Sequence, residues 1–137
     1  MTDFDEAALL EVARSAQRQA YAPYSRFRVG AALLVADGRI FAGANVENAA
    51  YPAAICAERV ALPAAVAAGA RAFTAIAVIG DGKGPCTPCG MCRQVLFEFA
   101  PDLHVIAAGV DGSVAHFVLG QDLLPHGFGP DRLRQDS

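Results

Sequence analysis

Hydrophobic and polar positions change their period several times along the chain. From Asp5 to Ala20 apolar residues recur at helical spacing, and Pro23 closes the region, so we expect an amphipathic first helix. Apolar residues then alternate over Val29–Val35 and return over Ile40–Ala44, on either side of an Asp-Gly pair. This pattern predicts a β-hairpin.

The middle of the chain predicts a second helix and a buried strand. An alanine-rich stretch runs from Cys56 to Gly69, a residue that commonly ends helices. Pro63 lies inside it and removes one backbone hydrogen bond, so we expect a kink or an early break. The short apolar run Phe73–Gly80 is typical of a central strand.

The last third repeats the alternation of helix and strand. Thr87-Pro88 is a favourable cap and first-turn pair for a helix over Cys89–Phe99. Leu103–Ala108 and Ser113–Val118 flank a second Asp-Gly turn, which predicts another hairpin. Helices and strands therefore alternate, as in an α/β fold.

Composition narrows the class of protein. The chain has 137 residues, 54% of them hydrophobic, and no linker divides it, so residues 1–137 are expected to form one domain. Net charge is -3 and the 11 Lys and Arg residues are scattered, which disfavours a nucleic acid polymer as partner. An acidic N-terminus and the lack of a long apolar run predict no membrane association and a cytoplasmic location.

Three of the four cysteines have the spacing of a metal site. Cys56 and Cys89 each begin a predicted helix, and Cys92 lies about one turn beyond Cys89. Three thiolates can fill three corners of a zinc tetrahedron, and the open fourth corner is the mark of a catalytic zinc. Helix N-termini offset the excess negative charge, and Arg59 is a candidate for a further hydrogen-bonding cation.

Glu58 lies two residues after the first cysteine of this group. A carboxylate within reach of zinc-bound water can take its proton and deliver it to a substrate. The alternative is an exposed first-turn glutamate that only favours the helix dipole. Its pairing with the cysteine pattern favours the proton shuttle.

Other interpretations of the cysteines remain open. Cys86 could close a structural four-cysteine site, although Pro88 favours a ligand pair that starts at Cys89. Cys89 and Cys92 at a helix start could instead form a redox pair, which would leave Cys56 without a role. The three histidines lack metal-ligand spacing.

Several motifs together resemble one family. Cys56-Ala57-Glu58 and Pro88-Cys89-Gly90-Met91-Cys92 follow the signature of zinc nucleoside deaminases. The rest of the match lies in the segments 21–27, 29–32, 45–48, 93–95, 123–125 and 128–129, in order along nearly the whole chain. The sequence is therefore similar to cytidine deaminases of the small homotetrameric class.

That resemblance implies both a fold and a reaction. The fold would be a three-layer α/β/α arrangement around a mixed five-stranded sheet. The reaction would be hydrolytic deamination of cytidine and deoxycytidine to uridine and deoxyuridine with release of ammonia, by a zinc-bound hydroxide with Glu58 as proton shuttle. Another cytosine compound such as blasticidin S is the alternative substrate, and a non-catalytic zinc-stabilised module is the alternative function.

The resemblance also implies roles for individual residues. Asn45 and Glu47 would bind the ribose 3′-hydroxyl, Phe27 would pack on the pyrimidine, and the backbone of Ala57 would contact the base. Phe128 would reach a bound base in a neighbouring subunit of a homotetramer. The implied partners are thus a nucleoside and further copies of this chain, and the implied cofactor is Zn²⁺.

Overall fold

A five-stranded sheet with helices on both faces forms the body of the protein. The computed structural model describes residues 3–134. Its elements, in chain order, are α1 (Glu6–Gln17), β1 (Val29–Val35), β2 (Ile40–Ala44), η1 (Tyr51–Ala53), α2 (Ala57–Ala67), β3 (Phe73–Gly80), α3 (Gly90–Phe97), β4 (His104–Ala108), β5 (Val114–Val118), η2 (Leu119–Leu123) and η3 (Pro130–Leu133).

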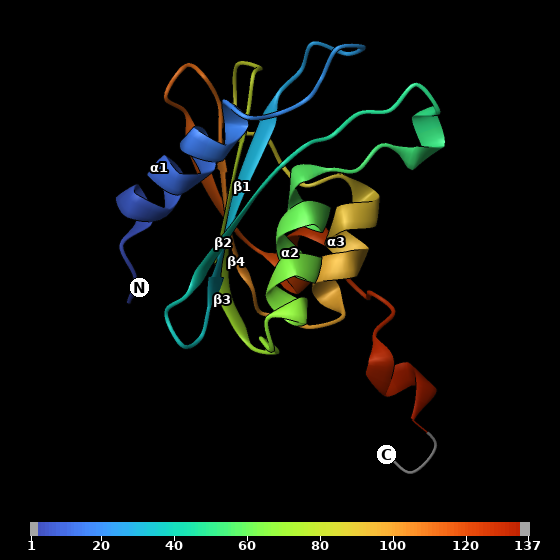
Figure 1. Ribbon diagram of the computed structural model, residues 1–137. Coiled ribbons are helices and arrows are strands. Elements are labelled where there is room, and N and C mark those ends of the chain that lie inside the picture. The colour runs from blue at the N-terminus through green and yellow to red at the C-terminus, as the bar shows by residue number, and fades with distance from the viewer. Residues whose placement is uncertain (1–2, 135–137) are drawn as a thin grey trace.

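The strand order confirms the expected mixed sheet. It runs β2-β1-β3-β4-β5, with β3 and β4 parallel and the other neighbouring pairs antiparallel. Both predicted hairpins, β1 with β2 and β4 with β5, are present. Figure 1 shows α1 on one face of the sheet and α2 and α3 side by side on the other, which is the three-layer arrangement.

Alternation along the strands divides the core into two clusters. In β1, Leu33 lies in the cluster under α2 and α3, whereas its neighbour Ala32 lies in the cluster under α1. In β3, Ile76 and Ala77 divide in the same way. Because successive side chains of a strand point to opposite faces, a sheet covered on both faces reads as a nearly continuous apolar run.

Two glycines let helices approach the sheet closely. A Cβ at Gly30 would lie 2.0 Å from the carbonyl oxygen of Ala13 in α1. On β2, a Cβ at Gly43 would lie 2.3 Å from the carbonyl oxygen of Ala57 and 2.8 Å from the amide nitrogen of Ala61. The first turn of α2 therefore lies directly on the backbone of β2.

Of the kink or early break predicted at Pro63, the early break does not occur. The α2 helix continues through this residue to Ala67. Pro63 is exposed, whereas Leu62 and Ala65 on either side of it are buried in the core. Packing on both sides of the proline holds the helix together despite the missing hydrogen bond, because tertiary contacts override local propensity.

The expected cap of the third helix is also wrong. Cys89, rather than Thr87, is the N-cap of α3, and the helix begins at Gly90. The Thr87 hydroxyl instead accepts a hydrogen bond from the guanidinium of Arg93 at 3.3 Å.

Between residues 3 and 134, no helix has both the length and the apolar character needed to span a membrane.

Replacing Gly43 by alanine should destabilise the fold, because the added methyl group meets the α2 backbone rather than a flexible side chain. We expect the free energy of unfolding to fall by about 1 to 3 kcal/mol, the usual cost of overpacking. Gly90→Ala is the matched control, since a Cβ there meets nothing within 4 Å. Denaturant titration of both variants measures the difference; equal stabilities would contradict the close approach.

Candidate metal centre and active site

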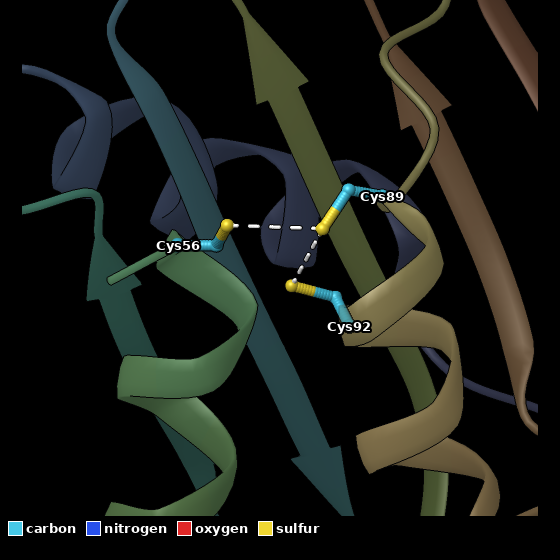
Figure 2. Close-up of side chains that lie close together, drawn as sticks. All are labelled: Cys56, Cys89 and Cys92. Atoms are coloured by element: carbon cyan, nitrogen blue, oxygen red, sulfur yellow. Dashed lines mark hydrogen bonds between the residues drawn. The ribbon is translucent and has the colours of Figure 1, made fainter. Parts of the chain in front are cut away.

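Two helix N-termini bring the three cysteines together. Cys56 is the N-cap of α2, Cys89 is the N-cap of α3, and Cys92 is buried in the first turn of α3. Figure 2 shows the three side chains pointing toward one another above the ends of the two helices. The Sγ atoms of Cys56 and Cys89 are 3.8 Å apart, and those of Cys89 and Cys92 are 3.4 Å apart.

This geometry fits a tetrahedral zinc ion. All three sulfur atoms lie within 4.8 Å of one another. Zn–S bonds of about 2.3 Å at tetrahedral angles place two sulfurs roughly 3.8 Å apart. The trio is therefore already close to the spacing that zinc requires, and it supplies three of four ligands.

Neighbouring groups favour the thiolate form of Cys56, the form that binds a metal cation. A hydrogen bond from Cys92 and the nearby Arg59 lower the pKa of Cys56 to about 5. The same bond to Cys56, together with burial, raises the pKa of Cys92. A terminal nitrogen of Arg59 donates to the Cys56 sulfur at 3.7 Å. The cation therefore offsets thiolate charge, as the sequence suggested for Arg59.

Glu58 is buried beside this cluster. Only 4% of the residue is exposed, so the alternative of an exposed first-turn glutamate is wrong. Burial raises the pKa of its carboxyl to about 7, and the negative charge of Cys56 acts in the same direction. A carboxyl that changes protonation near neutral pH is suited to carrying a proton in either direction.

Cys86 lies outside the metal cluster. Among residues 3–134, the group of metal-ligating side chains contains Cys56, Cys89 and Cys92 but not Cys86. The Cys86 sulfur packs instead over Gly80, where an added Cβ would lie 2.8 Å from it and 3.0 Å from the ring of Phe27. Burial raises the pKa of this thiol to about 11. The structure therefore gives no support to a closed four-cysteine site.

Asn45 holds the backbone that carries Phe27. Its side-chain oxygen accepts from the amide of Val29 at 2.8 Å, and its Nδ2 donates to the carbonyl of Phe27 at 2.9 Å. The ring of Phe27 lies against Gly80 and Gly82, and 40% of the residue is exposed. The structure thus brings these two predicted site residues together.

Glu47 orders the turn just before Phe27 and lines a cavity. Its carboxylate accepts from the amides of Tyr24 and Ser25 at 2.9 and 3.1 Å, and from the Ser25 hydroxyl. The Ser25 hydroxyl is the main reason that the pKa of Glu47 is lowered. The cavity measures about 330 Å³, and it is lined by Tyr24, Ser25, Glu47, Asn48, Tyr51 and Ala54.

Several of these cavity residues had no predicted role. Tyr24 and Ser25 belong to the segment 21–27, which resembles the deaminase family. Their contact with Glu47 could not be predicted, because they lie 23 and 22 positions before it in the sequence. Tyr51 is 71% exposed and belongs to a segment that the sequence indicated only as irregular. The signal that could have found it was an aromatic residue within a predicted loop that leads to a metal ligand.

The last two predicted site residues lie in different surroundings. Ala57 is fully buried in the first turn of α2, between the cysteine and the glutamate. Phe128 is 55% exposed, and its carbonyl accepts from the Gln94 side chain on α3 at 2.8 Å. Its position beside α3 differs from that of Phe27, which lies at the Gly80 end of β3.

Comparison with known proteins agrees with this geometry. The sequence profile of the cytidine and deoxycytidylate deaminase zinc-binding region matches residues 4–108. The chain belongs to this deaminase family. All three clustered cysteines lie within the matched zinc-binding region, so zinc is the cofactor of the site.

Individual members of the deaminase family are similar to this chain over most of their length. The cytidine deaminase of Halalkalibacterium halodurans is 46% identical over 125 residues, covering 90% of this chain and 94% of that protein. That of Sporosarcina psychrophila is 44% identical over 130 residues, covering 94% and 95%. The crystal structure of cytidine deaminase from Burkholderia pseudomallei matches with a TM-score of 0.88 and 50% identity, covering 91% of this chain and 100% of that chain.

Paired cysteine variants test the ligand set. Cys89→Ser should lose zinc, because the hydroxyl is a poor replacement for a thiolate, whereas Cys86→Ser should keep one zinc per chain. Metal analysis of the purified proteins measures this stoichiometry. Equal zinc loss in the two variants would contradict the three-ligand assignment.

Proposed function

We propose that this protein deaminates cytidine and deoxycytidine by hydrolysis, giving uridine or deoxyuridine and ammonia. One observation carries the proposal: a buried carboxyl lies beside three thiols at zinc spacing. A fully closed structural site would have no use for a proton carrier at this position. The family match and the similar cytidine deaminases support the same substrate class.

Glu58 moves the proton in this proposal. Zinc held by Cys56, Cys89 and Cys92 would supply a Lewis acid that makes water nucleophilic near neutral pH. The Glu58 carboxylate takes one proton from that water as its oxygen bonds to C4 of the cytosine ring, and passes this proton to N3. Glu58 then takes the second proton from the new C4 hydroxyl and gives it to the departing amino group, which leaves as ammonia. Burial beside the cysteines keeps bulk water from competing for the proton.

Asn45 and Glu47 bind the sugar in the same proposal. After their contacts with the chain, the Asn45 amide keeps a second N–H, and the Glu47 carboxylate keeps unused acceptor capacity. One can donate to a ribose hydroxyl and the other can accept from it. Phe27 then covers the pyrimidine, and the Ala57 backbone contacts the base.

Phe128 completes the site of a neighbouring subunit in a proposed homotetramer. The ring is exposed, and other large apolar side chains are exposed around the proposed site, among them Tyr24, Tyr51 and Met91. Exposed aromatic residues of this kind suit subunit contacts, since they bury much apolar area with little flexibility to lose. A cytoplasmic location belongs to the same proposal, because the cluster needs reduced thiols.

Glu58→Gln tests the proton carrier. The amide keeps the shape of the side chain but cannot accept and deliver a proton, so kcat should fall by several orders of magnitude with zinc retained. The control is Glu11→Gln, on the exposed surface of α1. Ammonia release from cytidine gives the rates. A loss of only about tenfold, or about 1.4 kcal/mol of barrier, would mean that another group carries the proton.

Subunit mixing tests the shared site. A chain truncated after His126 should bind zinc but bind cytidine poorly, because it lacks Phe128. Mixed with full-length Glu58→Gln under conditions that exchange subunits, it should regain activity by pairing an intact zinc site with a donated phenylalanine. Mixed oligomers that form without any rescue, or a native protein that is monomeric at micromolar concentration, would contradict the shared site.

A further inference from the structure

Arg93 contacts two parts of the chain that lie far apart in sequence. It follows the buried Cys92 directly on α3, and its guanidinium donates three hydrogen bonds. The acceptors are the carbonyl of Pro88 at 2.7 Å, the carbonyl of Leu123 at 2.9 Å and the hydroxyl of Thr87 at 3.3 Å. A single half-buried cation therefore bridges the approach to Cys89 and the beginning of the C-terminal segment.

The bond to Pro88 bears directly on the metal site. The side chain of Pro88 is fully buried, and its carbonyl belongs to the peptide bond that leads into Cys89. This carbonyl precedes the first turn of α3, so no helical hydrogen bond satisfies it. Because Arg93 supplies its partner, the orientation of the peptide before Cys89 depends on this guanidinium.

Gln94, the next residue on α3, holds the same C-terminal segment further along. Its Nε2 donates to the carbonyl of Phe128 at 2.8 Å. Between and beyond these two anchors the backbone packs tightly on Phe97, where a Cβ at Gly127 or Gly129 would lie 3.0 or 3.1 Å from the ring. Figure 1 shows this segment, coloured red, running past the end of α3.

We propose that Arg93 and Gln94 are positioning residues that hold the Phe128 segment in place relative to the cysteine turn. Arg93 joins the peptide before Cys89 to Leu123, and Gln94 fixes the segment at Phe128. The metal site and the phenylalanine of one chain thus form one connected unit built on α3. This inference deepens the proposed function, because it affects catalysis only if Phe128 contacts a base.

The two residues have separable effects, since the Gln94 side chain donates its hydrogen bond to Phe128 in the C-terminal segment and not to the peptide before Cys89. Gln94→Glu removes the donor without changing the size of the side chain, and its carboxylate faces a carbonyl. We expect KM for cytidine to rise about 3- to 10-fold, the equivalent of one hydrogen bond, with kcat and zinc release to a chelator near wild type. Gln19→Glu, on the exposed surface, is the matched control.

Arg93 variants should disturb both ends of the unit. Arg93→Met removes all three hydrogen bonds, so we expect zinc release to a chelator to be about tenfold faster, together with a higher KM. Arg93→Lys keeps the charge but reaches fewer acceptors, so it should lie between wild type and Arg93→Met. Arg14→Met, which removes an exposed cation paired with Glu11, is the control.

Hydrogen exchange gives a measurement that does not depend on activity. In the zinc-loaded proteins, amides of residues 124–134 should exchange several-fold faster in Gln94→Glu and in the Arg93 variants than in the two controls. Unchanged KM and exchange in Gln94→Glu would overturn the proposal. So would Arg93 variants that only lower Tm, with zinc release and exchange as in wild type.

Failure of this inference is distinguishable from failure of the proposed function. If the wild-type protein releases no ammonia from cytidine, the proposed function is wrong, while zinc release and exchange still test the connection through Arg93. If Arg93→Met does not fold, Arg93→Lys and Gln94→Glu decide the result.

Discussion

The close contact between the first turn of α2 and the backbone of β2 is the constraint on which the site depends. Gly43 has no side chain, so the Ala57 carbonyl oxygen can lie 2.3 Å from the position that a Cβ would take, too close for any other residue. This contact sets the height of Cys56 and Glu58 above the sheet. Because α3 packs beside α2 on the same face, its own N-terminal cysteines arrive at the same level. A single metal site can then form from Cys56 and Cys89, which are 33 positions apart in the sequence.

Charge compensation follows from this placement. Three thiolates would leave a divalent cation with an excess negative charge, which weakens it as a Lewis acid. Two helix N-termini point toward the cluster, and Arg59 contributes a full positive charge at the Cys56 sulfur. The same burial that concentrates these effects raises the pKa of Glu58 to about 7. The charge balance of the three cysteines and the raised pKa of Glu58 therefore both follow from the way the N-termini of α2 and α3 meet.

Hydrogen bonds from side chains to the backbone organise the loops around the cluster. Asn45 and Glu47 each bind backbone groups of the segment that contains Phe27, so the residues proposed to hold the sugar also shape the position of the ring. Arg93 and Gln94 do the same for the C-terminal segment. Loops held in this way can present side chains as accurately as regular elements do, because few of their polar groups remain free to rearrange.

The sequence alone determined the order of the three α-helices and five strands, the bounds of β1, β2 and β3, and the grouping of three cysteines, because these depend on local periodicity and on cysteine spacing at helix starts. Local signals failed at Pro63, where packing on both sides of the helix outweighs a missing hydrogen bond. They also failed at Thr87, whose hydroxyl binds Arg93 instead of capping α3. Only the tertiary structure decided that Glu58 is buried, that Cys86 packs over Gly80 and that Glu47 contacts Ser25. Each of these depends on how segments far apart in the sequence pack together. A local pattern of residue types carries no information about such contacts.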